Sequence, residues 1–220
     1  MRALVIGASG GVGSAVFQRL QKNGWDVTGL SRSIDGFDVG KATSVEKHLN
    51  AQSGPFDLVF VAVGVLAPLG TAPEKNLGAI GQGHMAQVFA VNTIGPALIL
   101  RHMPRLLPKD GRGVVAILSA RVGSIGDNHI GGWYSYRASK AALNQIVHGA
   151  AIELSRSHKQ SICVSLHPGT VETPFTADYA GRHKTVPADE AAANLLDVIA
   201  KLTPAQTGGF YDYAGREIVW

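Results

Sequence analysis

A glycine-rich turn near the N-terminus constrains the fold of this chain more than any other feature. Residues 7–13 read Gly-Ala-Ser-Gly-Gly-Val-Gly, directly after the short apolar run Ala3–Ile6 and before apolar residues at helical spacing. Glycines at such a strand-to-helix turn let the backbone approach a pyrophosphate, while the helix N-terminus supplies N–H donors and a positive dipole. The pattern therefore predicts an α/β fold with a buried parallel strand and a dinucleotide site at this turn.

The glycines of this turn fit two versions of the dinucleotide motif. One version uses Gly7, Gly11 and Gly13, and the other uses Gly7, Gly10 and Gly13. The alternative is a tight turn that holds no ligand. The residues expected to surround a pyrophosphate are Gly7, Ser9, Gly10, Gly11, Val12 and Gly13.

The end of the second expected strand, Asp26–Leu30, indicates which dinucleotide binds. A carboxylate at this point would bind the free 2′-hydroxyl of the adenosine ribose. The sequence instead has Ser31, Arg32 and Ser33, and the next acidic residue is Asp35. Two hydroxyls and a guanidinium suit a 2′-phosphate, so this loop predicts NADP(H). An ordinary surface arginine is the alternative.

Two more segments are expected beside the cofactor. Residues 57–63 form the clearest buried strand, and Gly64 after it would let the cofactor pass over the strand end. Residues 38–39 are expected to form a short third strand near the adenine. The residues expected at the cofactor in these segments are Asp38, Val39, Ala62, Val63 and Gly64.

A long helix is expected from about His84 to Leu106, and it contains Asn92 and Pro96. Proline has no N–H, so the carbonyl of Asn92 loses its helical partner. A carbonyl freed inside a protein must bind another group, often water. The proline could also do no more than kink the helix, so the open question is whether the carbonyl faces the site.

Tyr136 and Lys140 stand four residues apart, so they share one face if the segment is helical. An ammonium beside a phenol favours the phenolate, by about 4 kcal/mol at ~4 Å and an effective dielectric of ~20. That energy equals roughly three pKa units, enough to make the tyrosine an acid or base near neutral pH. An accidental pair on a solvated face is the alternative.

Composition excludes several classes of function. The net charge is +4 with scattered basic residues, so nucleic-acid binding is not expected. Cys163 is the only cysteine, which is typical of a reducing compartment, and a cytoplasmic location without a signal peptide is expected. No apolar run is expected to span a membrane. The histidines lack metal-binding spacing, so no metal is expected.

Five ordered motifs make the chain resemble the short-chain dehydrogenase/reductase family from end to end. They are Gly7-x-x-x-Gly11-x-Gly13, Ala62-Val63-Gly64, Asn92-x-x-Gly95, Tyr136-x-x-x-Lys140 and Pro168-Gly169-x-Val171-x-Thr173. The wording of residues 123–128 and 136–140 is similar to the carbonyl-reductase and C-factor-like branch. The family usually has Asn-Ala-Gly where this chain has Ala62-Val63-Gly64, so one side-chain hydrogen bond is lost and the glycine is kept.

The resemblance implies a single doubly wound Rossmann domain over residues 1–220, a parallel sheet with helices on both faces. It implies NADPH along the carboxyl edge of the strands and hydride transfer to a carbonyl of a small substrate. Tyr136 would protonate the oxygen, Lys140 would hold the nicotinamide ribose, and Asn92 would position a water. The residues implied at the nicotinamide end are Pro168, Gly169, Val171 and Thr173. An apolar, partly aromatic pocket wall of Ile125, His129, Trp133, Phe175 and Tyr179 suggests an uncharged carbonyl compound.

The sequence departs from the family at the third catalytic group, a serine at the end of the fifth strand. Ala120 takes that place, between Ser119 and the nearby Ser124. Side chains alternate along a strand, so Ser119 is expected to point away from whatever Ala120 faces. Ser124 follows the strand and is slightly favoured as the donor to the carbonyl. Both serines could instead be structural, with Ser119 bonding backbone and Ser124 capping a turn.

Other functions remain open at this point. An epimerase-type relative is disfavoured because the chain ends before the usual substrate domain. A non-catalytic dinucleotide sensor and a C-factor-like signalling protein are also compatible with the motifs. The helices that begin near His84 and Tyr136 are surfaces that the family commonly pairs, so a homodimer is predicted.

Overall fold

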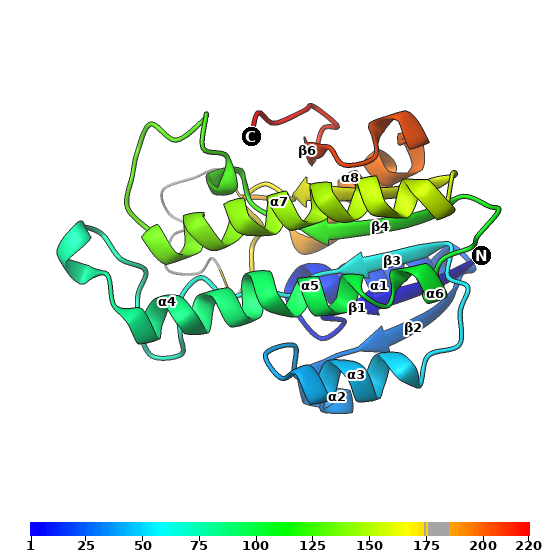
Figure 1. Ribbon diagram of the computed structural model, residues 1–220, viewed down its shortest axis with the longest axis horizontal. Coiled ribbons are helices and arrows are strands. Elements are labelled where there is room, and N and C mark those ends of the chain that lie inside the picture. Colours follow the sequence, from blue (N-terminus) through cyan, green and yellow to red (C-terminus); the bar gives the residue numbers. More distant parts are fainter. Residues whose placement is uncertain (174, 176–184) are drawn as a thin grey trace.

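The computed structural model describes residues 1–173, residue 175 and residues 185–220. Within these ranges it contains a sheet of six parallel strands in the order β2-β1-β3-β4-β5-β6 (Figure 1). The strands are β1 (Arg2–Ile6), β2 (Asp26–Leu30), β3 (Leu58–Val61), β4 (Gly113–Leu118), β5 (Ser161–His167) and β6 (Phe210–Asp212). This arrangement confirms the predicted doubly wound α/β fold.

Helices cover both faces of the sheet. The helices are α1 (Gly11–Lys22), α2 (Arg32–Asp35), α3 (Ala42–Asn50), α4 (Gln82–Phe89), the π-helical η2 (Ala90–Ile94), α5 (Gly95–Leu100), α6 (Met103–Leu106), α7 (Tyr134–Ser157) and α8 (Ala188–Lys201). Short 3-10 turns are η1 (Leu77–Ala79), η3 (Arg121–Gly123) and η5 (Pro204–Gln206). In Figure 1 the arrows of β2, β3 and β4 point toward the side where α7 begins and where the loops of residues 65–81 and 119–133 lie.

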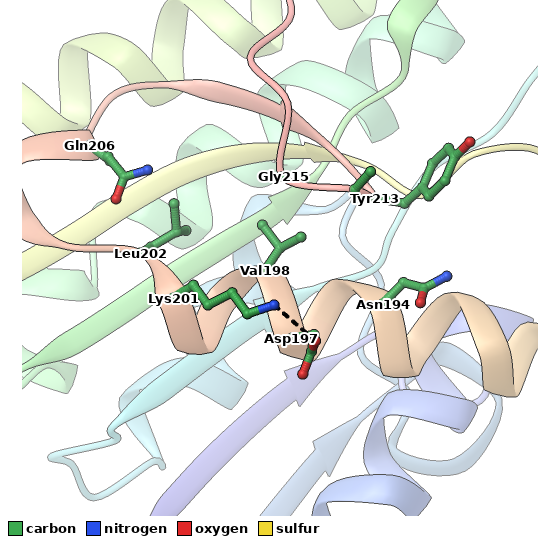
Figure 2. A pocket seen from close by; sticks show the side chains of 9 residues that line it. Asn194, Asp197, Val198, Lys201, Leu202, Gln206, Tyr213 and Gly215 are labelled. Atoms are coloured by element: carbon green, nitrogen blue, oxygen red, sulfur yellow. Dashed lines mark hydrogen bonds and ion pairs between the residues drawn. The ribbon is translucent and has the colours of Figure 1, made fainter.

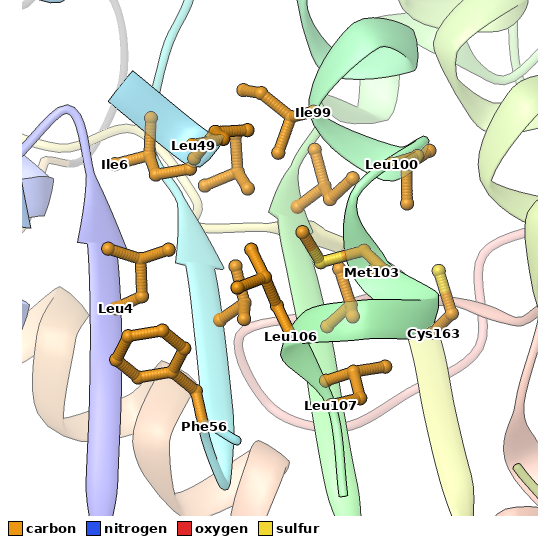
Figure 3. Packing of buried hydrophobic residues seen from close by; sticks show 14 of the residues in the cluster. Leu4, Ile6, Leu49, Phe56, Ile99, Leu100, Met103, Leu106, Leu107 and Cys163 are labelled. Atoms are coloured by element: carbon orange, nitrogen blue, oxygen red, sulfur yellow. The ribbon is translucent and has the colours of Figure 1, made fainter. Parts of the chain in front are cut away.

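Two hydrophobic cores form because the strands alternate their side chains between two covered faces. On one face, Leu4, Val59 and Ile117 pack with residues of α3, α5, α6 and α7 (Figure 3). On the other, Val5 and Phe60 pack with residues of α1 and α8. Strands buried on both faces read as continuous apolar runs, which is why the sequence identified them.

The expected strand at Asp38 and Val39 is wrong. These residues form a turn in which the Asp38 N–H donates to Ser44 Oγ at 2.9 Å and Asp38 Oδ1 accepts from the Gly40 N–H at 3.0 Å. The polar groups of Asp38 are therefore bonded within the turn and at the start of α3 rather than to a neighbouring strand. Val39 still packs into the core.

The long helix expected from His84 to Leu106 is interrupted. It begins at Gln82 as α4, passes through the π turn η2, and continues as α5, while α6 is separate. The Gly95 N–H bonds to the carbonyl of Ala90, five residues back, directly before Pro96. A π turn accommodates the proline that an uninterrupted α-helix would exclude.

The expectation that no apolar run could span a membrane is wrong for one segment. The helical stretch Gln82–Leu100 is long and apolar enough by length and composition. Within it, however, Asn92 and Thr93 are buried and donate hydrogen bonds to Ser139 of α7. The stretch therefore serves in this fold as a core helix that packs against α7.

Candidate active site

A groove of about 210 Å³ lies at the carboxyl edge of the sheet, where three segments meet. They are the glycine turn, the end of β2 with the turn after it, and the end of β3. The predicted cofactor residues that line the groove are Gly7, Ser9, Gly10, Ser31, Arg32, Asp38, Val39, Ala62, Val63 and Gly64. The structure thus brings together these ten of the residues that the sequence assigned to one ligand, whereas Val12, Ser33 and Pro168 are among those that do not line the groove.

The glycine turn distinguishes the two versions of the motif. A Cβ on Gly13 would collide with the carbonyl of Gly7, and a Cβ on Gly11 would collide with Thr173. Gly7 itself has φ +90°, a left-handed conformation that favours glycine. A Cβ on Gly10 would lie 3.4 Å from its nearest neighbour, an ordinary distance. The structure therefore requires glycine at the positions of the first version.

The segment after β5 lies beside the glycine turn, as the nicotinamide end should. Thr173 packs against Gly11, and Val171 is buried and forms a β-bridge with Val186. Gly169, after Pro168, has φ +80° and faces the ring of Tyr213. Tyr179, proposed for the pocket wall, lies outside the described residues.

The loop after β2 presents Arg32 differently from its two serines. Arg32 is exposed at the groove. Ser31 is buried and caps α2, with its hydroxyl donating to the Asp35 carboxylate at 3.2 Å and accepting from the Ile34 N–H at 3.3 Å. Ser33 Oγ donates to Ser9 Oγ at 2.9 Å. Arg32 is therefore the group best placed to meet a 2′-phosphate, while Ser31 is engaged in local structure.

Tyr136 and Lys140 lie one turn apart on α7 and are both buried. Lys140 Nζ donates to the carbonyl of Leu118, at the end of β4, at 2.9 Å. A methyl group on Gly64 would lie 3.5 Å from Lys140 Nζ, so the lysine adjoins the end of the groove. The tyrosine ring packs edge-on against Trp133, with 6.2 Å between centroids, and is 6.0 Å from Phe175. These contacts give the tyrosine an aromatic surrounding.

The expected lowering of the Tyr136 pKa is wrong for this structure. Burial raises the pKa of the phenol well above its ordinary value, and burial lowers the pKa of Lys140 to about 8. Desolvation disfavours the charged form of each group, because a charge in the interior loses water. Tyr136 therefore keeps its proton at neutral pH, which suits a proton donor.

Asn92 uses its side chain to hold the site together. Its Oδ1 accepts from the Val65 N–H and its Nδ2 donates to the Val65 carbonyl, both at 2.8 Å. Nδ2 also lies 3.1 Å from Ser139 Oγ. The amide thus ties the loop after β3 to the turn of α7 that carries the tyrosine. The water predicted at the main-chain carbonyl of Asn92 stays a prediction.

The two candidate serines are both buried and hydrogen-bonded. Ser119 Oγ donates to Asn144 Oδ1 at 2.7 Å, and Asn144 follows Lys140 by one turn on α7. Ser124 Oγ accepts from the Asp127 N–H at 3.1 Å. The Ser119 hydroxyl therefore donates its hydrogen bond to α7. The Ser124 hydroxyl accepts a hydrogen bond, and its own proton is not used in that bond.

A second hollow, of about 350 Å³, runs along α8 near residues 213–215 (Figure 2). It is lined by Asn194, Asp197, Val198, Lys201, Leu202, Gln206, Tyr213, Ala214 and Gly215. None of the predicted site residues lines it, so we do not assign the chemistry there. Among the described residues, no group of three His, Cys, Asp or Glu side chains is placed to hold a metal ion.

Comparisons with known proteins agree with this geometry. A family model described as enoyl-(acyl carrier protein) reductase matches residues 34–202. The chain is 32% identical to 1-hydroxy-2-glutathionyl-2-methyl-3-butene dehydrogenase of Rhodococcus sp. (strain AD45), over 99% of this chain and 98% of that protein. The chain belongs to the short-chain dehydrogenase/reductase family of oxidoreductases.

Two other relatives extend this family assignment. The chain is 37% identical to C-signal of Myxococcus xanthus, over 78% of this chain and 96% of that protein. A Burkholderia multivorans structure described as a short-chain dehydrogenase/reductase with bound NADP superimposes with a TM-score of 0.84 at 27% identity, covering 100% of this chain and 99% of that one. The predicted resemblance to the family and its C-factor branch is thereby confirmed.

Some residues of this short-chain dehydrogenase/reductase site carried no signal in the sequence. Phe37, Val65 and Val91 line the groove but belong to no motif, because an apolar wall needs only shape. Glu74 was also missed: it is buried beside the first turn of α7, although a glutamate in a Pro- and Gly-rich loop looks like a surface residue. Its sequence neighbours, Ala-Pro-Glu-Lys at residues 72–75, form no motif that indicates a role.

Burial of a histidine near this site predicts a pH effect on stability. Burial, and then Arg121, lower the pKa of His167 from 6.5 to about 4, while Asp212 opposes the shift. The unfolded chain then binds more protons between pH 6.5 and 4, so folding stability falls as the pH falls through that window. A shift of this size corresponds to roughly 3 kcal/mol.

As the pH is lowered from 6.5 to 4, the free energy of unfolding should fall more steeply in wild type than in His167→Gln. Urea unfolding at several pH values in this range measures the difference. The exposed His129 gives the control, since His129→Gln should run parallel to wild type. If the free energy of unfolding of His167→Gln had the same pH dependence as that of wild type, His167 would not be the source of the pH effect.

Proposed function

We propose that this chain is an NADPH-dependent reductase that converts the carbonyl of a small, uncharged substrate to an alcohol. The observation that carries the proposal is the buried Tyr136, one helical turn from a lysine that adjoins the end of the groove. NADP bound to the Burkholderia multivorans relative supports this choice of cofactor. The proposal treats residues 1–220 as one functional unit.

The residues around the groove fit the parts of NADPH. The glycine turn packs so closely that a Cβ on Gly7 would collide with Ala62, and Gly7, Ser9 and Gly10 line the groove just before the N-terminus of α1, which suits a pyrophosphate. Arg32 would meet the 2′-phosphate and Lys140 the nicotinamide ribose. When bound, NADPH supplies the hydride for the carbonyl carbon. Tyr136 gives its proton to the carbonyl oxygen, so the products are an alcohol and NADP⁺.

An uncharged substrate follows from the surroundings of the tyrosine. The rings of Trp133 and Phe175 pack beside it, and Ile125 is exposed in the nearby loop. A charged group placed among these rings would lose hydration without a paired partner. We therefore propose aldehydes, ketones or quinones as the substrate class, to be tested as NADPH consumption on a panel of these compounds.

A second candidate function is NADP-dependent signalling without turnover. The specific observation is the likeness to C-signal over 78% of the chain. Both functions use the same groove, so they differ in chemistry only. Tight NADPH binding with no turnover on any carbonyl compound would favour the sensor or signal, whereas turnover that depends on Tyr136 supports the reductase.

Cofactor choice gives a direct prediction. Arg32→Ala should raise the Kd for NADPH by about 10- to 100-fold, because a hydrogen bond between charged groups contributes ~1.5–3 kcal/mol. The Kd for NADH should change little, since it lacks the 2′-phosphate. Fluorescence titration of both cofactors measures this, with Arg101→Ala, directly after α5, as the control. Equal affinities for the two cofactors in wild type would contradict the assignment.

Assembly gives another prediction. We propose a homodimer through the helical faces that include Ile94 of η2 and Ile152 of α7, which are 53% and 49% exposed. Ile152→Glu should then shift the mass from dimer to monomer in light scattering at micromolar concentration, because a buried charge disfavours the interface. Ile34→Glu on α2 is the control, since Ile34 lies on a different element. A monomeric wild type would end the proposal.

A further inference from the structure

We propose that Glu74 is a positioning residue that fixes Tyr136 by binding the first turn of α7; this inference rests on the proposed function. Glu74 lies in the loop between β3 and α4, 61 residues before Ser135 in the sequence. Its side chain is only 2% exposed. A carboxylate buried this deeply destabilises the folded protein unless hydrogen bonds or an opposite charge compensate for the lost water.

The contacts of Glu74 surround the residues that lead into Tyr136. Its carboxylate accepts from the Ser135 N–H at 3.2 Å and from the Ser135 hydroxyl. Its main-chain carbonyl accepts from the Trp133 N–H at 2.5 Å. One residue of a distant loop thus holds the chain at two points immediately before the tyrosine.

Helix α7 lacks a cap of its own. Its N-cap residue, Trp133, has φ 51° and ψ 44° and makes no side-chain capping bond, and the first turn contains no acidic residue. The first N–H groups of a helix need acceptors, and its positive end favours a negative charge. Glu74 supplies both from outside the helix. Burial raises its pKa, but the hydrogen bonds from Ser135 and the neighbouring His84 outweigh burial and lower it overall, so the carboxylate stays charged.

His84 extends the clamp to α4. Its Nε2 is buried 3.7 Å from Glu74 Oε1. The carboxylate therefore touches three elements: its own loop, α4 through His84 and α7 through Ser135. This arrangement sets the direction from which Tyr136 enters the site and the place of the Trp133 ring that packs on it.

The other side of the same turn is fixed independently. Ser139 Oγ donates to the Tyr136 carbonyl at 2.8 Å, and Lys140 is bonded to Leu118. Loss of Glu74 should therefore loosen the start of α7 without dissolving the helix or the cofactor groove. Misplacement of a reacting group by about 1 Å can lower a rate ~100-fold.

Kinetics of Glu74→Ala and Glu74→Gln test the proposal. We expect Glu74→Ala to lower kcat about 10- to 100-fold, with the KM for the carbonyl compound and the Kd for NADPH changed by less than about threefold. Glu74→Gln should recover most of kcat, because the amide can still bond the N–H and hydroxyl of Ser135. Ser135→Ala should cost less than Glu74→Ala, since the backbone bond remains.

Asp57→Ala is the matched control. The Asp57 carboxylate also accepts a backbone N–H, that of Arg2 at 2.7 Å, but at the opposite edge of the sheet. Its loss should lower the Tm without changing kcat. A wild-type kcat in Glu74→Ala, equal losses in Glu74→Ala and Asp57→Ala at matched folded fraction, or a Glu74→Gln as poor as Glu74→Ala would overturn the proposal.

A second readout needs no turnover and separates this inference from the proposed function. The chain has three tryptophans, so Trp25→Phe with Trp220→Phe leaves Trp133 as the only one. In that background, Glu74→Ala should raise acrylamide quenching of Trp133 about twofold, whereas Glu74→Gln should leave it unchanged. The reason is that only the alanine variant loses the bonds that hold the segment around Trp133. Unchanged quenching overturns the clamp. Raised quenching in a protein whose wild type reduces no carbonyl supports the clamp and overturns the reductase assignment alone.

Discussion

Tyr136→Phe is expected to abolish nearly all reductase activity while leaving NADPH affinity unchanged. General acid catalysis by a positioned side chain contributes about 10²–10⁴-fold, and phenylalanine has no proton to give. The ring keeps its place, because Phe has nearly the shape of Tyr and the contacts to Trp133 and Phe175 involve the ring. Steady-state kinetics and NADPH titration on the purified variant measure both quantities.

The neighbouring Tyr134 provides a matched control, since it lies in the same first turn of α7. Tyr134→Phe removes a hydroxyl from the same helix and should turn over like wild type. If Tyr136→Phe also turned over like wild type, the proton would come from elsewhere and the assignment would fail. A loss of NADPH binding in Tyr136→Phe would show a structural rather than a chemical effect.

Ser124→Ala is expected to lower kcat by about 10²–10³, the usual cost of losing one preorganised hydrogen-bond donor. Ser124 Oγ accepts from the Asp127 N–H, and that bond does not use the proton of the hydroxyl itself. Ser119→Ala is expected to act on stability instead. Its hydroxyl donates to the buried Asn144 Oδ1, and leaving that oxygen unpaired costs about 1–3 kcal/mol.

Kinetics and urea unfolding on the two alanine variants form one experiment, in which each serine is the control for the other. The reversed pattern, with Ser119→Ala slow and Ser124→Ala merely less stable, would make Ser119 the catalytic serine. Wild-type turnover in both variants would mean that the carbonyl receives no serine hydrogen bond. That outcome would agree with Ala120 at the position where the family has its serine.

Much of the fold could be predicted because its signals are local. A buried parallel strand needs a run of apolar residues, and the runs at Ala3–Ile6 and 57–63 coincide with β1 and β3 to within two residues at each end. In the glycine turn, Gly13 is required for a local reason, because a Cβ there would collide with the carbonyl of Gly7, whereas a Cβ on Gly11 would collide with the distant Thr173. The strand expected at Asp38 and Val39 was wrong because bonds to α3, rather than local propensity, decide that turn.

The pairing of Tyr136 with Lys140 was also local, since four residues always make one helical turn. The protonation states of the two side chains, in contrast, do not follow from local spacing. Sequence spacing suggested a lowered phenol pKa, but the packed rings and the sheet remove water from both groups, and burial raises it instead. Burial depends on every element that covers the site, so a motif cannot supply it.

The sequence by itself determined the fold class, the family and most of the residues that meet at the groove. Only the tertiary structure decided which of the predicted site residues are already engaged: Asn92 with Val65, and Ser119 with Asn144. It also revealed Glu74 at the start of α7. The physical reason is that turns, strands and helix faces depend on residues close together in the sequence. Desolvation, and hydrogen bonds between side chains of distant segments, exist only once the chain is packed.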